Sequence, residues 1–145
     1  MDNMDAWQKL QDKIWPRAAI PDRLEPWRSA GAKVVFTNGC FDLLHYGHIH
    51  YLTEARALGT HLIVGLNADA SVKRLKGQHR PIKDERNRSM ILAALACVDA
   101  VVIFAEDTPL SLIEAISPEV LVKGGDWAPE QIVGNEWVSA RGGVV

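Results

Sequence analysis

Two histidines, His45 and His48, stand three residues apart with Gly47 between them, shortly after an apolar run at residues 34–36. The apolar run is typical of a strand, and an amphipathic run begins at His48. A strand, a glycine-containing turn and a helix start suit phosphate groups, because backbone N–H groups and the helix dipole favour negative charge there. The imidazoles can donate further hydrogen bonds. This segment therefore predicts chemistry on a nucleoside triphosphate.

Other interpretations of the histidine pair exist. Histidines near a helix start can cap the helix or pack against it, and a pair at this spacing can bind a metal ion. The pair supplies only two metal ligands, however, and no cysteine or third histidine stands at a matching spacing. Gly47 would let a ligand approach the backbone closely. We therefore expect His45 and His48 to bind phosphate, and we expect no metal ligands from the protein.

Basic residues are concentrated between positions 73 and 80, which we predict to be a loop after a strand. A solvated basic loop is the ordinary explanation of such a run. Its position after the carboxyl end of a strand favours a role in neutralising a triphosphate. Lys76 is the first candidate for a phosphate contact, and Lys73, Arg74 and Arg80 would share that role as a mobile clamp.

Two further charged residues have competing interpretations. Arg88 opens a predicted helix, where the helix dipole does not help a cation. A phosphate partner and an ion pair with Asp84 or Glu85 both explain it, and the spacing does not decide between them. Asp42 follows Phe41 in the first turn, and we expect it to brace that loop through N–H groups rather than to bind a metal ion.

The segment from Lys123 to Trp127 reads Lys-Gly-Gly-Asp-Trp. Paired glycines leave room for a flat base or a ribose, Asp126 can accept from hydroxyl groups, and Trp127 offers a stacking face. A β-turn around a buried tryptophan is the alternative. The sequence contains neither GxGxxG nor GxxxxGK[ST], so a dinucleotide fingerprint and a P-loop are excluded.

Strands and helices alternate from residue 32 onwards. We predict strands at 33–37, 61–66, 99–104 and 119–122, and helices at 48–58, 85–96 and 109–116. Alternation with continuous apolar strands predicts an α/β fold, in which helices cover both faces of a Rossmann-like parallel sheet. Ligands of such sheets lie beyond the carboxyl ends of the strands. We therefore expect the polar groups that follow the strands to converge, namely Thr37, Asn38 and Gly39, then Asn67 and Asp69, then Lys123, Gly124, Asp126 and Trp127.

Length and composition limit the function further. The 145 residues suit one main domain at 31–145, and residues 1–30, with three tryptophans and three prolines, predict a helical extension packed on it. A net charge of −2 does not support nucleic-acid binding. No apolar run approaches the ~20 residues of a membrane span, and the acidic start does not resemble a signal peptide. Cys40 and Cys97 read as reduced thiols, which predicts a cytoplasmic protein.

Four segments in order carry a resemblance to a known family. Residues 39–48 resemble the HxGH element of the cytidylyltransferase-like nucleotidyltransferases. Three further segments, residues 64–71, 74–82 and 122–127, resemble a narrower group within that superfamily. Together they are similar to the adenylyltransferases of ADP-heptose synthesis, across roughly residues 32–145. The resemblance implies AMP transfer from ATP to D-glycero-D-manno-heptose 1-phosphate for lipopolysaccharide cores, with Mg²⁺ held mainly by the ATP phosphates. It also implies a homodimer and a separate heptose kinase that supplies the sugar phosphate.

The resemblance assigns roles to the candidate residues. His45 and His48 would stabilise the α-phosphate in the transition state, Lys76 would bind phosphate, and Arg88 matches a functional arginine of the family. Phosphate would also contact the backbone at Thr37, Asn38, Gly39, Cys40 and Phe41. The nucleoside and sugar sites would be lined by Asn67, Asp69 and residues 123–127.

One departure from the family pattern leaves alternatives open. The family usually continues beyond a segment like residues 142–145 into a Ser/Thr-rich turn and helix, which this sequence does not contain. A nucleotide-binding module without turnover is therefore one alternative. A cytidylyltransferase acting on glycerol 3-phosphate is another, because HxGH does not separate ATP from CTP.

Overall fold

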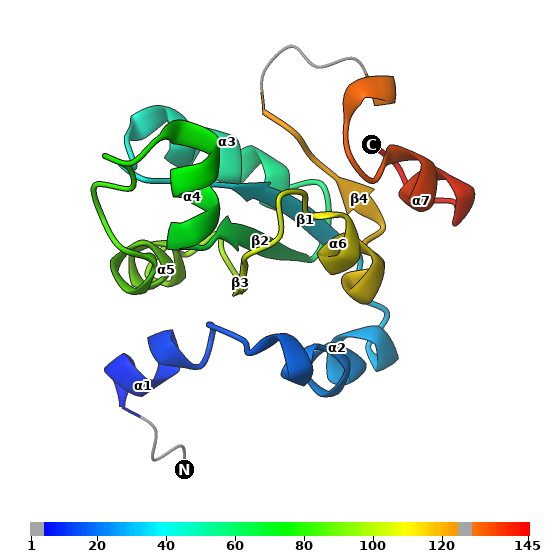
Figure 1. Ribbon diagram of the computed structural model, residues 1–145. Coiled ribbons are helices and arrows are strands. Elements are labelled where there is room, and N and C mark those ends of the chain that lie inside the picture. Colours follow the sequence, from blue (N-terminus) through cyan, green and yellow to red (C-terminus); the bar gives the residue numbers. More distant parts are fainter. Residues whose placement is uncertain (1–4, 125–128) are drawn as a thin grey trace.

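Four parallel strands form one sheet in the order β3-β2-β1-β4 in the computed structural model, which describes residues 5–124 and 129–145 (Figure 1). The strands are β1 (Val34–Gly39), β2 (His61–Asn67), β3 (Ala100–Phe104) and β4 (Val120–Leu121). β1 pairs with β2 on one side and with β4 on the other, and β2 pairs with β3. The predicted α/β fold with a Rossmann-like parallel sheet is confirmed.

Helices connect the strands and flank the sheet. They are α1 (Ala6–Gln11), η1 (Arg17–Ala19), α2 (Ile20–Ser29), α3 (Tyr46–Arg56), α4 (Asp69–Lys76), α5 (Glu85–Ala93), α6 (Leu110–Ile116), η2 (Pro129–Gln131) and α7 (Asn135–Ala140). In Figure 1, α3, α4 and α5 lie on one side of the sheet and α2 and α6 on the other. None of the helices in the described ranges has both the length and the apolar character that a membrane crossing requires.

The strands bury both of their faces because their side chains alternate between two apolar clusters. Val34 and Phe36 of β1 belong to the cluster beneath α2 and α6, whereas Val35 belongs to the cluster beneath α3 and α5. In β2, Ile63 faces the first cluster and its neighbours face the second. Each fully buried side chain of this size contributes about 1.5–3 kcal/mol of stability, so the paired clusters fix which strand face meets which helices.

Residues 5–30 share this core. Trp15 is 5% exposed and its backbone N–H donates to the carbonyl of Val101 at 2.9 Å, which joins the segment to the outer strand β3. The Trp27 ring stacks on His61 at the start of β2, with ring centroids 4.1 Å apart. These contacts place the N-terminal helices under the sheet and away from the carboxyl ends of the strands.

Several predicted boundaries were wrong by a few residues, each for a local reason. The helix predicted from His48 begins at Tyr46, because the side chain of His45 caps it. The strand predicted from Asp99 begins at Ala100, because the Asp99 carboxylate accepts from the backbone of Leu62. The main error concerns residues 73–80, which we expected as a loop. Residues up to Lys76 lie in α4, which continues the chain directly after β2.

The order of the strands defines where a ligand can bind. The chain proceeds outward from β1 to β2 and β3, and then returns to β4 on the other side of β1. A crevice opens at such a switch point, outside the carboxyl ends of the two neighbouring strands whose connections leave in opposite directions. β1 and β4 are those strands, and residues 40–48 and 122–124 follow them.

Candidate functional site

A pocket with a volume of about 620 Å³ lies at this switch point. Its volume falls within the range of small-molecule sites. The carboxyl ends of β1 and β4 contribute to it, together with the start of α3 and the end of α4. The pocket is lined by Asn38, Gly39, Cys40, Phe41, Asp42, Leu43, His45, Gly47, His48, Tyr51, Lys76, Arg80, Lys123 and Gly124. Most of the residues that the sequence singled out therefore do meet in one place.

His45 stands at the N-cap of α3 and folds its ring back over the first turn. Its Nδ1 accepts from the backbone N–H of Gly47 at 3.0 Å. His48 completes the arrangement, because its own Nδ1 accepts from the backbone N–H of His45 at 3.2 Å. The two ring centroids are 4.1 Å apart. The capping interpretation of the pair and its place in the pocket are thus both true.

These two hydrogen bonds decide which ring nitrogen carries the proton. A neutral imidazole has one N–H donor and one acceptor, and a nitrogen that accepts from a backbone N–H cannot carry the proton. The proton of each ring is therefore assigned to Nε2 from the hydrogen-bond network. Neither Nε2 atom has a hydrogen-bond partner in the described ranges, so both N–H groups are available to a ligand oxygen.

The surroundings of His48 favour its neutral form. Burial lowers the pKa of His48, and the nearby positive charges of His45 and Lys76 lower it further. The Phe41 ring packs edge-on against the His48 ring with centroids 5.6 Å apart. His48 is thus held as a neutral donor beside a cationic Lys76, an arrangement suited to an oxyanion.

Gly47 serves a purpose that differs from the predicted one. A Cβ atom at this position would lie 2.8 Å from Cε1 of His45. The missing side chain therefore makes room for the capping imidazole, in addition to any close approach by a ligand. The spacing of the two histidines and the glycine between them form one structural unit.

Asp42 braces the loop, as the sequence predicted. Its carboxylate accepts from the backbone N–H groups of Ile82 and Lys83 and from Nε of Arg80, at 2.6–3.0 Å. Burial alone would raise the pKa of Asp42, but the two backbone N–H groups and the Arg80 guanidinium lower it to about 2. The carboxylate thus fastens the β1–α3 loop to the segment that precedes α5.

Arg88 occupies a different place from the predicted phosphate contact. Its side chain is 0% exposed, and its guanidinium donates at 2.7–2.9 Å to the carbonyls of Lys83, Cys40 and Asn67 and to the carboxylate of Asp69. Both sequence interpretations were wrong in detail, because the ion-pair partner is Asp69 rather than Asp84 or Glu85. Arg88 acts on the site indirectly, by tying together the loops that line it.

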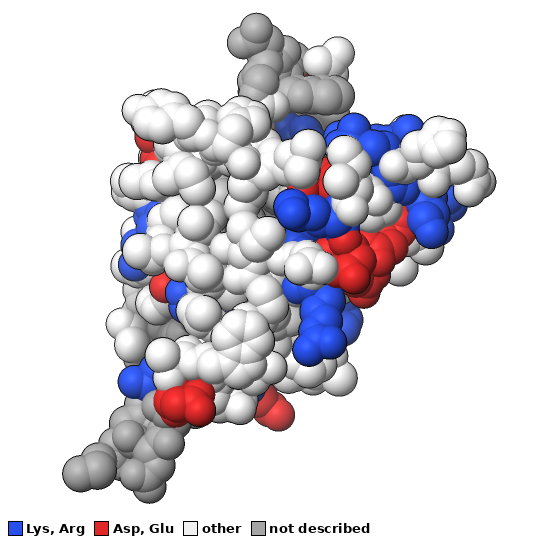
Figure 2. Space-filling model, turned by 90° about the vertical axis from the view of Figure 1, so that its left-hand side faces the viewer, with Lys and Arg blue, Asp and Glu red and all other residues white. Residues whose placement is uncertain are grey.

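The basic residues near α4 separate into different roles. Lys76 and Arg80 line the pocket, and Arg80 is paired with Asp42. Arg74 instead pairs with Asp107 at 2.8 Å, and Lys73 lines a neighbouring surface hollow. The predicted clamp of Lys73, Arg74 and Arg80 is therefore not assembled. Figure 2 shows Lys and Arg side chains gathered in one area of this side of the molecule, with Asp and Glu side chains among them.

Three predicted site residues support the pocket from outside its lining. Thr37 is fully buried, and its hydroxyl bonds to the phenol of Tyr51. Asn67 is 4% exposed and donates to the hydroxyl of Ser71 at 2.7 Å, and Asp69 is held by Arg88. They belong to the framework of the site in this structure.

The sequence reasoning missed Tyr51 and Leu43. Tyr51 lies one helical turn beyond His48 on α3, so the i, i+3 spacing could have identified it. Its phenol reaches from Thr37 to the carbonyl of Val122, and burial raises the pKa of that phenol. Tyr51 thereby links the ends of β1 and β4 across the floor of the pocket.

The segment after β4 is described only in part. Lys123 and Gly124 line the pocket, and a Cβ atom at Gly124 would lie 3.4 Å from the Tyr51 ring. Asp126 and Trp127, which we expected to meet the ribose and the base, lie outside the described residues. Within the described residues, no group of three or more His, Cys, Asp or Glu side chains could hold a metal ion.

Comparisons with known proteins agree with this geometry. The cytidylyltransferase-like family matches residues 36–144, which include every described element from α3 to α7. The bifunctional protein HldE of Nitrobacter hamburgensis is 62% identical over 126 residues, which is 87% of this chain and 26% of that protein. The bifunctional protein HldE of Syntrophotalea carbinolica is 56% identical over 137 residues, covering 94% of this chain and 28% of that protein. The chain thus spans under a third of the length of either relative.

A solved structure has the same fold. The lipopolysaccharide core biosynthesis protein from Thermoplasma volcanium superposes with a TM-score of 0.63 at 31% sequence identity, covering 79% of this chain and 93% of that one. The family match and these likenesses lead to one conclusion. The chain belongs to the cytidylyltransferase-like family of nucleotidyltransferases.

Proposed function

We propose that this chain transfers AMP from ATP to D-glycero-D-manno-heptose 1-phosphate, which yields ADP-heptose and pyrophosphate for lipopolysaccharide cores. The observation that carries a nucleotidyl transfer is the pair of Nε2–H donors beside Lys76 in the pocket between β1 and β4. The choice of sugar is supported by the relatives called HldE and by the structural neighbour, a lipopolysaccharide core biosynthesis protein.

In this proposal the nucleophile needs no general base. The acceptor is a phosphomonoester, whose second pKa is ~6, so its oxygen is already ionised at neutral pH. That oxygen forms a bond to the α-phosphorus of ATP while the bond from the α-phosphorus to the bridging oxygen breaks. The electron pair leaves with pyrophosphate. The protein has to align the two reactants and stabilise the charge that develops on the phosphoryl oxygens.

The residues of the pocket suit that task. The Nε2–H groups of His45 and His48 would donate to oxygens of the α-phosphate, and their positions are fixed in advance by the backbone of α3. Lys76 and Lys123 would supply positive charge for the phosphates. The Tyr51 hydroxyl is engaged within the framework, so we assign it no proton transfer.

Mg²⁺ would be held mainly by the phosphates of ATP. In the described lining the one carboxylate is that of Asp42, and both of its oxygens already accept N–H groups of the protein. This donor set does not form a magnesium site of its own. When bound with ATP, the cation would neutralise phosphate charge. The histidine and lysine side chains described above would orient the phosphates and stabilise the developing charge. The heptose 1-phosphate would be supplied by a kinase activity.

Pyrophosphate release from each nucleoside triphosphate, with heptose 1-phosphate or glycerol 3-phosphate as acceptor, tests the proposal. We expect release with ATP and heptose 1-phosphate, and at least ~10²-fold slower turnover for His48→Ala, the range seen when an oxyanion donor is removed. Preferential release with CTP and glycerol 3-phosphate would replace the proposal by cytidylyl transfer. Binding of nucleotide with no product from any pair would identify a binding module.

A further inference from the structure

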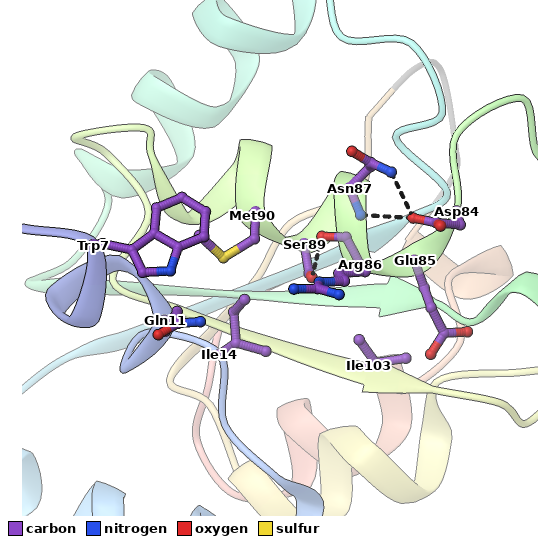
Figure 3. A pocket seen from close by; sticks show the side chains of 10 residues that line it. All are labelled: Trp7, Gln11, Ile14, Asp84, Glu85, Arg86, Asn87, Ser89, Met90 and Ile103. Atoms are coloured by element: carbon purple, nitrogen blue, oxygen red, sulfur yellow. Dashed lines mark hydrogen bonds between the residues drawn. The ribbon is translucent and has the colours of Figure 1, made fainter.

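A second pocket, with a volume of about 700 Å³, lies between α1 and α5 (Figure 3). It shares no lining residue with the pocket of the histidine pair. The N-terminal helix α1, the segment that follows it, the first two turns of α5 and the outer strand β3 form its walls. The reaction proposed above uses none of these residues.

One end of this pocket is apolar and aromatic. Trp7 of α1 and Met90 of α5 lie next to each other there, and Ile14 and Ile103 continue the apolar surface along the floor (Figure 3). Trp7 is 56% exposed, and the helix α1 that carries it buries none of its residues. A large apolar side chain is therefore left open to solvent at this end of the pocket. An indole face beside a thioether and two branched chains provides a platform for a flat apolar group.

The middle of the pocket carries a positive charge without a fixed partner. The Arg86 side chain lies between the aromatic end and the acidic end, as Figure 3 shows. Across residues 5–124 and 129–145, the Arg86 side chain makes no hydrogen bond or ion pair, in contrast to that of Arg88 on the same helix; only the backbone carbonyl of Arg86 accepts, from the Ser89 hydroxyl at 3.1 Å. Gln11 adds an amide on the opposite wall. A guanidinium that is open on its planar edge is well suited to a carboxylate, sulfonate or phosphate.

The two carboxylates in the wall are engaged with the protein. Asp84 caps α5 by accepting from the backbone and side-chain N–H groups of Asn87, at 2.8 Å each. Glu85 accepts from the backbone N–H of Asp69 at 2.9 Å. Both lie at the end of the pocket away from Trp7 (Figure 3). They restrict the place of a bound anion to the Arg86 side of the pocket.

We propose that the pocket between α1 and α5 is a second small-molecule site, which takes a flat apolar group bearing an anionic substituent. The flat group lies against Trp7 and Met90, and the anion meets the Arg86 guanidinium. The volume and the concave shape are those of small-molecule sites, and the Arg86 guanidinium, whose side chain makes no hydrogen bond or ion pair in the described residues, lies there beside an aromatic platform.

Methionine methyl NMR provides a direct test. The chain has three methionines, of which Met90 is the one within residues 5–124 and 129–145, and Met90 lines the pocket, so [methyl-¹³C]methionine labelling places a reporter in its wall, assigned with Met90→Leu. The probe is naphthalene-2-sulfonate, with naphthalen-2-ol as its uncharged counterpart. We expect the sulfonate to shift the Met90 signal along a saturable single-site curve. Absence of a saturable shift would overturn the proposal.

Variants separate the two parts of the proposed recognition. Arg86→Gln should weaken sulfonate binding by about tenfold or more while changing naphthalen-2-ol binding little, because only the charged hydrogen bond is lost. Trp7→Ala should weaken the binding of both probes. Arg141→Gln is a matched control, because Arg141 is an arginine that lies over a different, partly buried tryptophan, Trp137, outside this pocket. Equal sulfonate affinity in Arg86→Gln and wild type would refute the anionic class, and equal affinity in Trp7→Ala would refute the site.

Discussion

The His45–His48 pair shows how backbone geometry prepares two side chains for one task. Each Nδ1 accepts a backbone N–H group, and each Nε2–H therefore faces away from the helix backbone. A proton added to either Nδ1 would break the hydrogen bond that fixes that ring. The neutral tautomer is thus a property of the capped helix, and ligand is not needed to select it.

The pKa of His48 should be below the ordinary histidine value of 6.5, because burial and the charges of His45 and Lys76 disfavour the imidazolium. Removing the positive charge with Lys76→Gln should move this pKa upward, since one repulsive partner of the protonated ring is lost. NMR titration of the ring signals measures both values. An unchanged His48 pKa in the variant would show that Lys76 does not act on the ring.

Gly47→Ala should lower turnover by at least about tenfold with little loss of stability. The added Cβ would lie 2.8 Å from the His45 ring, so the ring has to leave its capping position. Alanine is otherwise favoured over glycine in a helix by about 1 kcal/mol, which limits any loss in thermal stability. Turnover and melting temperature, measured side by side, check the expectation. A variant with wild-type turnover would mean that the position of the His45 ring is unimportant.

At the scale of elements, α5 connects the loops of the site to the rest of the fold. Arg88 on this helix holds carbonyls from the ends of β1 and β2 and from the segment before α5, and Asp42 holds that segment from the other side. These bonds join residues up to 48 positions apart in the sequence. The pocket therefore depends on the placement of one helix.

Arg88→Ala should reduce the free energy of unfolding by about 3 kcal/mol, because buried carbonyls and the Asp69 carboxylate lose their donor. Arg88→Lys should recover only part of this loss, since one ammonium group cannot reach four acceptors from the same position. Urea denaturation measures the values. Arg86→Ala, two positions earlier on α5, is the control and should change stability by less than about 0.5 kcal/mol. Equal effects of the two alanine variants would contradict the role of Arg88.

Asp42→Asn should destabilise the protein in a pH-dependent way. The carboxylate has a pKa of about 2 in the folded chain against an ordinary value of 3.8, so its stabilisation is present above pH 4 and is lost as the pH falls towards 2. A shift of this size corresponds to about 2 kcal/mol near neutral pH. Unfolding of both proteins across this pH range should give curves that differ at pH 7 and converge at the acid end. A constant difference would exclude the carboxylate charge as the cause.

At the scale of the whole molecule, the sheet was predictable because continuous apolar runs and the alternation of strands and helices are local patterns. The convergence of residues 38–48 with Lys76 and Lys123 followed from the same logic, since the carboxyl ends of parallel strands meet. The partners of Arg88 could not be predicted, because its acceptors are main-chain carbonyls that leave no trace in residue types. The helical part of residues 73–80 was missed because its charges suggested a loop, whereas Val72 is fully buried and anchors α4.

The strand order also explains why the two pockets have different characters. The first lies at the carboxyl ends of β1 and β4, and the loops that follow these strands supply it with hydrogen-bond donors and cations. The second lies against the outer strand β3, where α1 and α5 meet, and its wall has an aromatic and aliphatic end beside a charged one. The two pockets share no lining residue, so the fold keeps the two regions separate.

A crystal structure with a non-hydrolysable ATP analogue, α,β-methylene ATP, tests the account at its centre. The arrangement of α3 predicts that Nε2 of both His45 and His48 lies within hydrogen-bond distance, about 3 Å, of the α-phosphate oxygens, with Lys76 at the neighbouring phosphates. An analogue bound elsewhere, or imidazoles that face away from its phosphates, would contradict the assignment of this pocket to nucleotidyl transfer.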